Sequence, residues 1–188
     1  RSTQAKTLFP YTTLFRSTIK AFQLMWLTLS RPNESVQAEW AEFDLDKALW
    51  TIPARRMKAR REHVVPLPTQ AVELLKAMHP ITGHTKFVFP NRDDRQRPMA
   101  DAALRQALKK LGWATKYSPH GTRTTGSTRL NEMGYRPDAI EAQLAHAEPN
   151  SVRRTYNHAT YLDERRVMMQ DWADKLDGWK THARKDAN

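Results

Sequence analysis

Large apolar residues recur at helical spacing near the start of the chain. Within residues 18–30 they fall on one predicted helix face: Ala21, Phe22, Met25, Trp26 and Leu29. A second helix is predicted to start at Arg31, because Pro32 is favoured in a first turn and Glu34 complements the positive end of a helix. This helix is expected to run to about Trp40.

Two stretches between residues 43 and 67 have the extended character of strands. Residues 43–53 contain two short apolar runs around an Asp-containing turn, and residues 63–67 form a third run that contains Pro66. Proline lacks an amide hydrogen, so the third strand is expected at the edge of a small antiparallel sheet. Lys58 is expected to project from the turn between the second and third strands.

From Thr69 onwards the apolar spacing is again helical. The sequence predicts helices over residues 69–78, 99–111, 120–133, 138–145, 149–158 and 161–179. The last of these has an apolar stripe wide enough to dock on another surface. The predicted fold class is therefore α+β and mainly helical: a helix bundle with a small three-stranded antiparallel sheet near its N-terminal side.

The two ends of the chain differ from the region between them. Residues 1–17 show no clear period, contain Pro10, and resemble the translated sequencing-adaptor peptide found at the ends of some gene models. They are predicted to be a non-native tip, with an extended arm packed on the domain as the alternative. Residues 181–188 are charged and are expected to be disordered. A single domain is expected over residues 18–180.

The chain is strongly basic, with 31 Lys and Arg against 20 Asp and Glu and a formal net charge of +11 over 188 residues. This balance favours a polyanionic partner: nucleic acid first, with an anionic membrane surface or simple solubility as alternatives. The absence of cysteine excludes disulfides, thiolate zinc sites and a cysteine nucleophile. The longest apolar run is too short to cross a bilayer and no leader is recognised, so a cytoplasmic protein is expected.

Hydrogen-bond donors are concentrated in three short motifs of the second half. His120 and Arg123 share one helix face, His146 lies at a turn between two helices, and Tyr156 follows Arg153. Such donors suit a phosphate better than a metal ion, and a phenol among them could attack phosphorus. The alternatives are a helix cap for His120, a structural histidine at 146 and a packing role for Tyr156. Other tyrosines compete for the nucleophile: Tyr117, Tyr135 and Tyr161.

A second basic group lies in the first half. Arg31 stands at a helix junction and could clamp two phosphate oxygens, although a surface arginine bonded to nearby carbonyls is the alternative. Lys58 lies in a basic run where a turn can place its ammonium in a groove as a proton donor. The remaining predicted contacts to a nucleic-acid backbone are Arg55, Arg56, Arg60, Arg61, Thr122, Thr124 and Arg153.

In this order the motifs resemble the catalytic domain of tyrosine recombinases, the DNA breaking and rejoining fold, and in particular prophage integrases of the satellite-phage type. The resemblance covers about residues 18–179. It rests on residues 40–45, 50–53, 56–58, 63–67, 87–90, 120–123, 130–134, 143–146, 156–157 and 164–169. Two positions depart from the family pattern: Asn33 stands where glycine is usual, and Thr122 where a bulky apolar residue is usual.

The resemblance implies a separate catalytic role for each of these residues around one DNA phosphate. The groups that would hold the phosphate and stabilise its transition state are Arg31, His120, Arg123 and His146. Tyr156 would attack to give a 3′-phosphotyrosine, Lys58 would protonate the leaving 5′ oxygen, and His120 would accept the proton of the phenol. No metal ion or nucleotide cofactor is implied, because the covalent link conserves the energy of the broken bond.

The resemblance further implies site-specific DNA recombination, in the integration or excision of a prophage or genomic island. The implied partners are a double-stranded DNA attachment site and other copies of the chain, joined through the last helix as a tetramer on DNA, in the bacterial cytoplasm. The family's N-terminal DNA-clamping domain is not recognised, so weak binding or partial cleavage is expected of this chain. The alternatives are cleavage and resealing like a type IB topoisomerase, or a DNA-binding module without chemistry.

Overall fold

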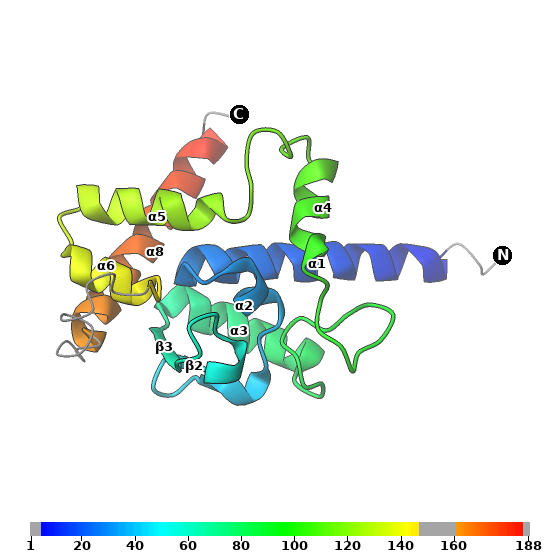
Figure 1. Cartoon of the computed structure of the whole chain (residues 1–188). Helices are drawn as coiled ribbons and strands as arrows, with labels where there is room; N and C mark the ends of the chain where they lie inside the picture. Colours follow the sequence, from blue (N-terminus) through cyan, green and yellow to red (C-terminus); the bar gives the residue numbers. More distant parts are fainter. Residues whose placement is uncertain (1–4, 147–160, 186–188) are drawn as a thin grey trace.

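The structure, a computed structural model, describes residues 5–146 and 161–185. One long helix runs through the molecule, and a small sheet lies on one side of it (Figure 1). The helices are α1 (Ala5–Thr28), α2 (Pro32–Val36), α3 (Thr69–Thr82), α4 (Ala102–Lys110), α5 (Gly121–Glu132), α6 (Pro137–Gln143) and α8 (Leu162–Lys185), with 3-10 turns at Trp40–Glu42 and Ala54–Arg56. Because α1 contacts α2, α3, α4, α5 and α8, it is the element on which the others are assembled.

Three short strands form an antiparallel sheet in the order β1-β2-β3. They are β1 (Phe43–Asp44), β2 (Leu49–Ile52) and β3 (His63–Pro66). Trp50 of the central strand is paired with Phe43 on one side and with Val65 on the other. Pro66 therefore lies in an edge strand, where its missing amide hydrogen removes no ladder bond, and this prediction is confirmed.

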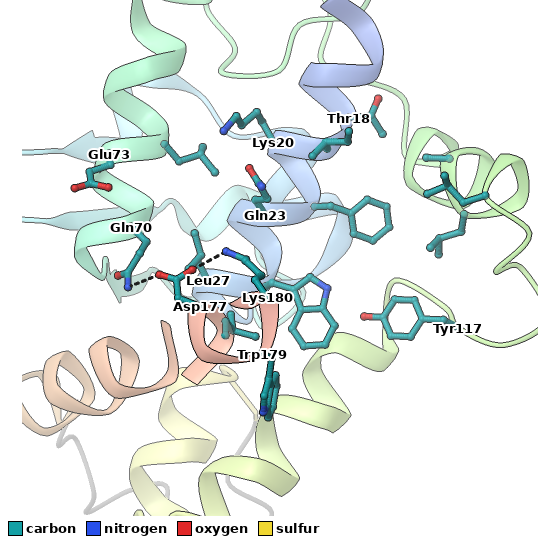
Figure 2. A pocket seen from close by; sticks show the side chains of 18 of the residues that line it. Thr18, Lys20, Gln23, Leu27, Gln70, Glu73, Tyr117, Asp177, Trp179 and Lys180 are labelled. Carbon is teal, nitrogen blue, oxygen red and sulfur yellow. Dashed lines mark hydrogen bonds and ion pairs between the residues drawn. The ribbon is translucent and has the colours of Figure 1, made fainter. Parts of the chain in front are cut away.

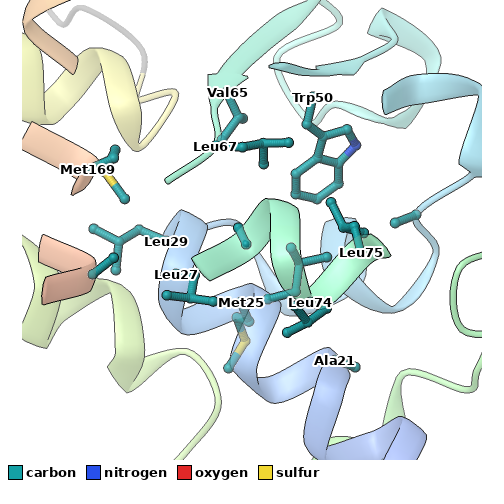
Figure 3. Packing of buried hydrophobic residues seen from close by; sticks show 14 of the residues in the cluster. Ala21, Met25, Leu27, Leu29, Trp50, Val65, Leu67, Leu74, Leu75 and Met169 are labelled. Atoms are coloured by element: carbon teal, nitrogen blue, oxygen red, sulfur yellow. The ribbon is translucent and has the colours of Figure 1, made fainter. Parts of the chain in front are cut away.

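The main core lies where the sheet, α1, α3 and α8 meet. Trp50, Met25, Leu75 and Met169 are all buried in one hydrophobic cluster (Figure 3). Trp50 also donates its indole N–H to Glu42 Oε2 at 3.0 Å, which satisfies its one polar atom. Burying each of the aliphatic side chains contributes about 1.5–3 kcal/mol, so this cluster fixes the sheet firmly against α1.

The end of α1 is shaped by a tight turn and a close helix contact. Leu29 has a left-handed φ of 53°, and the extended Arg31 that follows starts α2 with a proline in its first turn. Glu34 closes the turn, because its Oε2 accepts the backbone N–H of Arg31 at 2.7 Å. A β-carbon at Gly126 would lie 2.7 Å from Leu29 Cδ1, so glycine is what lets α5 approach the end of α1.

The predicted fold class and sheet are confirmed, but α1, α3 and α8 are longer than expected, and α2 ends at Val36 rather than near Trp40. α1 begins at Ala5, so residues 5–17 are helical rather than extended; adding turns to an existing buried helix is easier than nucleating one. α8 continues to Lys185, so the expectation of disorder from residue 181 is wrong as far as 185. Inside that helix Thr181 Oγ1 donates to the carbonyl of Asp177 at 3.0 Å. The helix predicted over 149–158 lies outside the described residues.

Candidate active site

Arg123 bridges the ends of two helices from the first turn of α5. Its side chain is only 4% exposed, and its guanidinium donates from Nη1 to the carbonyl of Leu29 at 2.6 Å and from Nη2 to the carbonyl of Leu144 at 2.5 Å. Leu29 follows α1 and Leu144 caps α6. The short packing distance at Gly126, one turn further along α5, is what brings Arg123 to the end of α1.

Arg31 reaches the same turn from the other side. Its Nη1 donates to Glu34 Oε1 at 2.8 Å and its Nη2 to the carbonyl of Ala145 at 3.2 Å. Its side chain is 25% exposed, so it is partly accessible to an incoming anion. Burial first, and then the positive charge of Arg31, lower the pKa of Arg123 to about 10.

His63 of β3 completes a series of three contacts. Its Nε2 donates to the carbonyl of Gln143 at 3.1 Å, so the carbonyls of residues 143, 144 and 145 are bonded by His63, Arg123 and Arg31 in turn. We call these three carbonyls the α6 carbonyl turn. Burial, followed by the charges of Arg165, Arg123 and Arg31, lowers the pKa of His63 to about 3, so the imidazole is neutral at physiological pH.

The two histidines predicted from the motifs lie at the surface. His146 directly follows the α6 carbonyl turn and is exposed, and its Nδ1 lies 2.6 Å from Glu141 Oε2, which accepts a hydrogen bond from the ring. This contact orients the imidazole. His120 stands at the N-terminus of α5, and its side chain makes no cap hydrogen bond to that helix. The cap role considered for His120 is therefore not found.

Lys58 and part of the basic run are available to a ligand. Lys58 is exposed in the connection between β2 and β3, as predicted. Arg60 and Arg61 are exposed beside it, and Arg55 is mostly exposed although it lies 3.4 Å from Glu39. These side chains can reach a polyanion without breaking a buried contact.

Two residues predicted to contact nucleic acid are instead turned into the protein. Arg56 is 10% exposed, forms an ion pair with Glu42, and donates from Nη2 to the carbonyl of Glu34 at 2.7 Å. Its guanidinium therefore ties the two 3-10 turns beside the sheet to α2. Thr122 is fully buried, and its hydroxyl is hydrogen bonded to the Tyr117 hydroxyl. Thr124, two residues further along α5, is exposed.

Tyr156 and Arg153 lie outside the described residues. The predicted nucleophile and one predicted DNA contact are therefore not placed relative to the arginines. The structure brings Arg31 and Arg123 together at the α6 carbonyl turn. His146 is the residue that directly follows this turn.

Gln143 and Arg165 are two further polar residues at this site for which the sequence predicted no role. Gln143 is 1% exposed; its Nε2 donates to the carbonyl of Thr28 at 2.7 Å, and its Oε1 accepts from Arg165 Nε at 2.9 Å. Arg165 also donates from Nη2 to the carbonyl of Val64 at 2.7 Å. A polar residue on the apolar face of the predicted helix 138–145 was the available signal for Gln143.

A large groove of the described surface lies elsewhere. It has a volume of about 1020 Å³ and is formed by α1, α3, α4 and α8, with Trp26, Tyr117 and Trp179 along its apolar walls (Figure 2). None of the five candidate catalytic residues that the structure describes lines it: Arg31, Lys58, His120, Arg123 and His146. The groove is therefore separate from the arginine site. Within the described ranges, no helix is long and apolar enough to cross a membrane.

The fold has clear counterparts among solved structures. The integrase from mycobacterium phage Brujita superposes with a TM-score of 0.64 and 16% sequence identity, over 86% of this chain and 55% of that one. The Tn1549 transposon integrase, solved in complex with transposon right end DNA, gives a TM-score of 0.53 and 16% identity, over 90% of this chain and 64% of that one. At these identities the likeness establishes the fold: the catalytic-domain fold of tyrosine recombinases.

The chain belongs to the phage integrase family, whose sequence profile matches residues 6–162. It is 47% identical to prophage integrase IntA of Escherichia coli K12 over 152 residues, which is 80% of this chain and 37% of IntA. It is 48% identical to prophage integrase IntZ of the same strain over 158 residues, 84% of this chain and 39% of IntZ. The integrase of Enterobacteria phage P4 is 43% identical over 173 residues, again 84% and 39%. The family resemblance is confirmed, and the chain spans about two fifths of the length of these relatives.

Proposed function

We propose that this chain carries the active site of a site-specific DNA recombinase, which cleaves a strand through a 3′-phosphotyrosine at Tyr156 and exchanges it with a partner strand. The observation that supports this most is the α6 carbonyl turn, which holds Arg31 and Arg123 side by side. Relatives named as integrases, and a structural neighbour solved with transposon DNA, support DNA as the substrate.

In this proposal the two guanidinium groups bind the scissile phosphate. Each guanidinium has five N–H donors, and the contacts to carbonyls and to Glu34 use only part of that number. The remaining donors of Arg31 and Arg123 stabilise the charge that develops on the phosphate oxygens in the transition state, a contribution of roughly 3–4 kcal/mol for each well-placed donor.

The exposed groups around this pair take the remaining proposed roles. His146 and His120 donate to phosphate oxygens, His120 accepts the proton of the Tyr156 phenol, and Lys58 protonates the leaving 5′ oxygen. Lys58 lies in a surface turn and His120 at a helix start, where both are open to a DNA strand. The scheme uses no metal ion or nucleotide cofactor, because the phosphotyrosine keeps the energy of the broken bond.

The proposed partners are duplex DNA and further copies of the chain. The net charge of +11 favours DNA, with Arg55, Arg60, Arg61, Thr124 and Arg153 on its backbone. Self-association through α8, as a tetramer on DNA, is supported by the exposed apolar residues of that helix, Val167 and Trp179. Residues 18–180 form the catalytic unit in this proposal.

Covalent capture of DNA tests the proposal. The chain is incubated with a pool of nicked duplexes that have a randomised core, so that cleavage releases a short fragment and traps the adduct, whose DNA is then sequenced. We expect an adduct with the parent and none with Tyr156→Phe, at unchanged DNA affinity. No adduct from the parent would contradict the chemistry and leave a DNA-binding module. Junction formation between two marked duplexes separates recombination from topoisomerase-like resealing.

A further inference from the structure

The polar contacts behind the arginine site form a continuous brace between two helix ends. Gln143 donates to the carbonyl of Thr28, and Arg123 donates to the carbonyl of the next residue, Leu29. On the other side Arg123 bonds the carbonyl of Leu144, the next residue after Gln143. The end of α1 and the end of α6 are therefore joined twice, once by a neutral amide and once by a guanidinium.

Only one orientation of the Gln143 side-chain amide allows hydrogen bonds to both of its partners. Its amide nitrogen needs an acceptor, which is Thr28, and its amide oxygen needs a donor, which is Arg165. At 1% exposure no water replaces either contact. The amide plane is therefore fixed, and with it the backbone from which the α6 carbonyl turn begins.

The same side chain connects the elements that carry the candidate catalytic residues. Arg165, in the first turn of α8, also donates a hydrogen bond to the carbonyl of Val64 in β3. The neighbouring His63 donates to the backbone carbonyl of Gln143. The strand β3 follows the turn that holds Lys58. Gln143 thus links α1, α6, β3 and α8 at one point.

We propose that Gln143 is a positioning residue for DNA cleavage: its side-chain amide holds the α6 carbonyl turn in the one arrangement that lets Arg31 and Arg123 bind the same phosphate. The inference rests on the proposed function. It makes Arg165 the partner through which Gln143 acts, because Arg165 Nε is the donor that fixes the amide oxygen.

The simpler role for Gln143 is a buried polar bond that only stabilises the fold, and a matched variant separates the two. Thr82 is also buried, and its hydroxyl donates to the carbonyl of Val88 at 2.9 Å, between α3 and the extended segment that follows it. This hydrogen bond involves no residue of the arginine site. Thr82→Val therefore removes a buried hydrogen bond without disturbing the α6 carbonyl turn.

The experiment compares Gln143→Leu, Arg165→Met, the double variant and Thr82→Val with the parent chain. Single-turnover formation of the DNA adduct is measured at saturating DNA, beside the DNA dissociation constant and the thermal midpoint. We expect Gln143→Leu to slow adduct formation about tenfold to hundredfold at saturating DNA, as a displacement of about 1 Å does, with affinity changed less than about threefold. The double variant should lose less than the sum of the two single losses, because the two substitutions share the contact between Gln143 and Arg165.

Two outcomes overturn the positioning role. One is a Gln143→Leu rate equal to that of Thr82→Val, and the other is additive losses in the double variant. If the parent itself forms no adduct, the proposed function fails, and a readout without DNA decides the positioning role. That readout is the NMR shift of the His63 Nε2–H, which reports its hydrogen bond to the Gln143 carbonyl: it should change in Gln143→Leu and stay the same in Thr82→Val. An unchanged His63 Nε2–H shift in Gln143→Leu would then refute the inference.

Discussion

Acid should destabilise the protein through one histidine. His63 has a pKa of about 3 in the folded chain, against about 6.5 in an unfolded one, because it is buried and faces Arg165, Arg123 and Arg31. Protons therefore bind the unfolded chain first. The stability contributed by neutral His63 is complete above pH 6.5 and is lost progressively as the pH falls toward 3.

The size of the effect follows from the difference between the two pKa values. The full contribution is about 5 kcal/mol, of which about 2 kcal/mol is lost by pH 5. His63→Gln removes the titration, while a glutamine amide can still donate to the Gln143 carbonyl. Between pH 7.5 and pH 5, the parent should lose about 2 kcal/mol more than His63→Gln, since the other titrating groups are common to both proteins.

Urea unfolding followed by circular dichroism measures this difference directly. Free energies of unfolding are obtained at pH 7.5, 6 and 5 for the two proteins. Parallel curves, with equal losses for parent and variant, would refute the reasoning, because they would mean that His63 takes up its proton equally in the folded and unfolded chains. A greater loss in the variant would show that the sign is wrong.

Three further substitutions test the packing and charge assignments. Gly126→Ala should destabilise the fold by about 1–3 kcal/mol in thermal unfolding, because its β-carbon overlaps a buried leucine, whereas Gly121→Ala should not. Arg56→Ala should lower the free energy of unfolding in urea by about 3–5 kcal/mol, because it leaves a buried carboxylate without its ion-pair partner. Arg60→Ala should leave this free energy unchanged and lower the salt slope of DNA binding by about one. Arg123→Lys should lower the free energy of unfolding in urea by about 1–3 kcal/mol and abolish the covalent DNA adduct, because a compact ammonium lacks the planar fork that spans two carbonyls and a phosphate.

Each of these has a result that would count against the structure. Equal stability of Gly126→Ala and Gly121→Ala would mean that α5 does not approach α1 as closely as described. A weaker salt slope for Arg56→Ala than for Arg60→Ala would return Arg56 to the DNA surface. An active Arg123→Lys adduct would show that the paired carbonyl contacts are dispensable.

Local patterns predicted the elements because each depends on neighbouring residues. The edge position of Pro66 follows from its missing amide hydrogen, and the start of α2 from a proline in a first turn. The direction of an individual side chain does not follow in the same way. Arg56 stands in a basic run that suggested a solvated face, yet its guanidinium is buried against a carboxylate that occurs fourteen residues earlier.

The role of Gln143 was not accessible from local pattern for the same reason. Its amide reaches the carbonyl of Thr28, 115 residues away in the chain, and Arg165, 22 residues away. Spacing along one helix shows only that a polar residue falls on the buried face, since period says nothing about which distant backbone atom meets it. The sequence analysis assigned a role to the histidine of this motif, and the structure adds a role for the glutamine three residues before it.

The use of backbone carbonyls explains how two like charges can be held close and remain reactive. Glu34 is bonded to Arg31, whereas both hydrogen bonds of Arg123 go to carbonyls. The carbonyls at the end of a helix carry partial negative charge, so they orient a guanidinium without neutralising it. A carboxylate in their place would compete for the same donors with the phosphate of the proposed function. Since Arg123 is buried, its charge acts through a low effective dielectric, and the charges of Glu34 and Glu141 offset it only in part. An anion that reaches the exposed part of Arg31 therefore meets the field of both guanidinium groups.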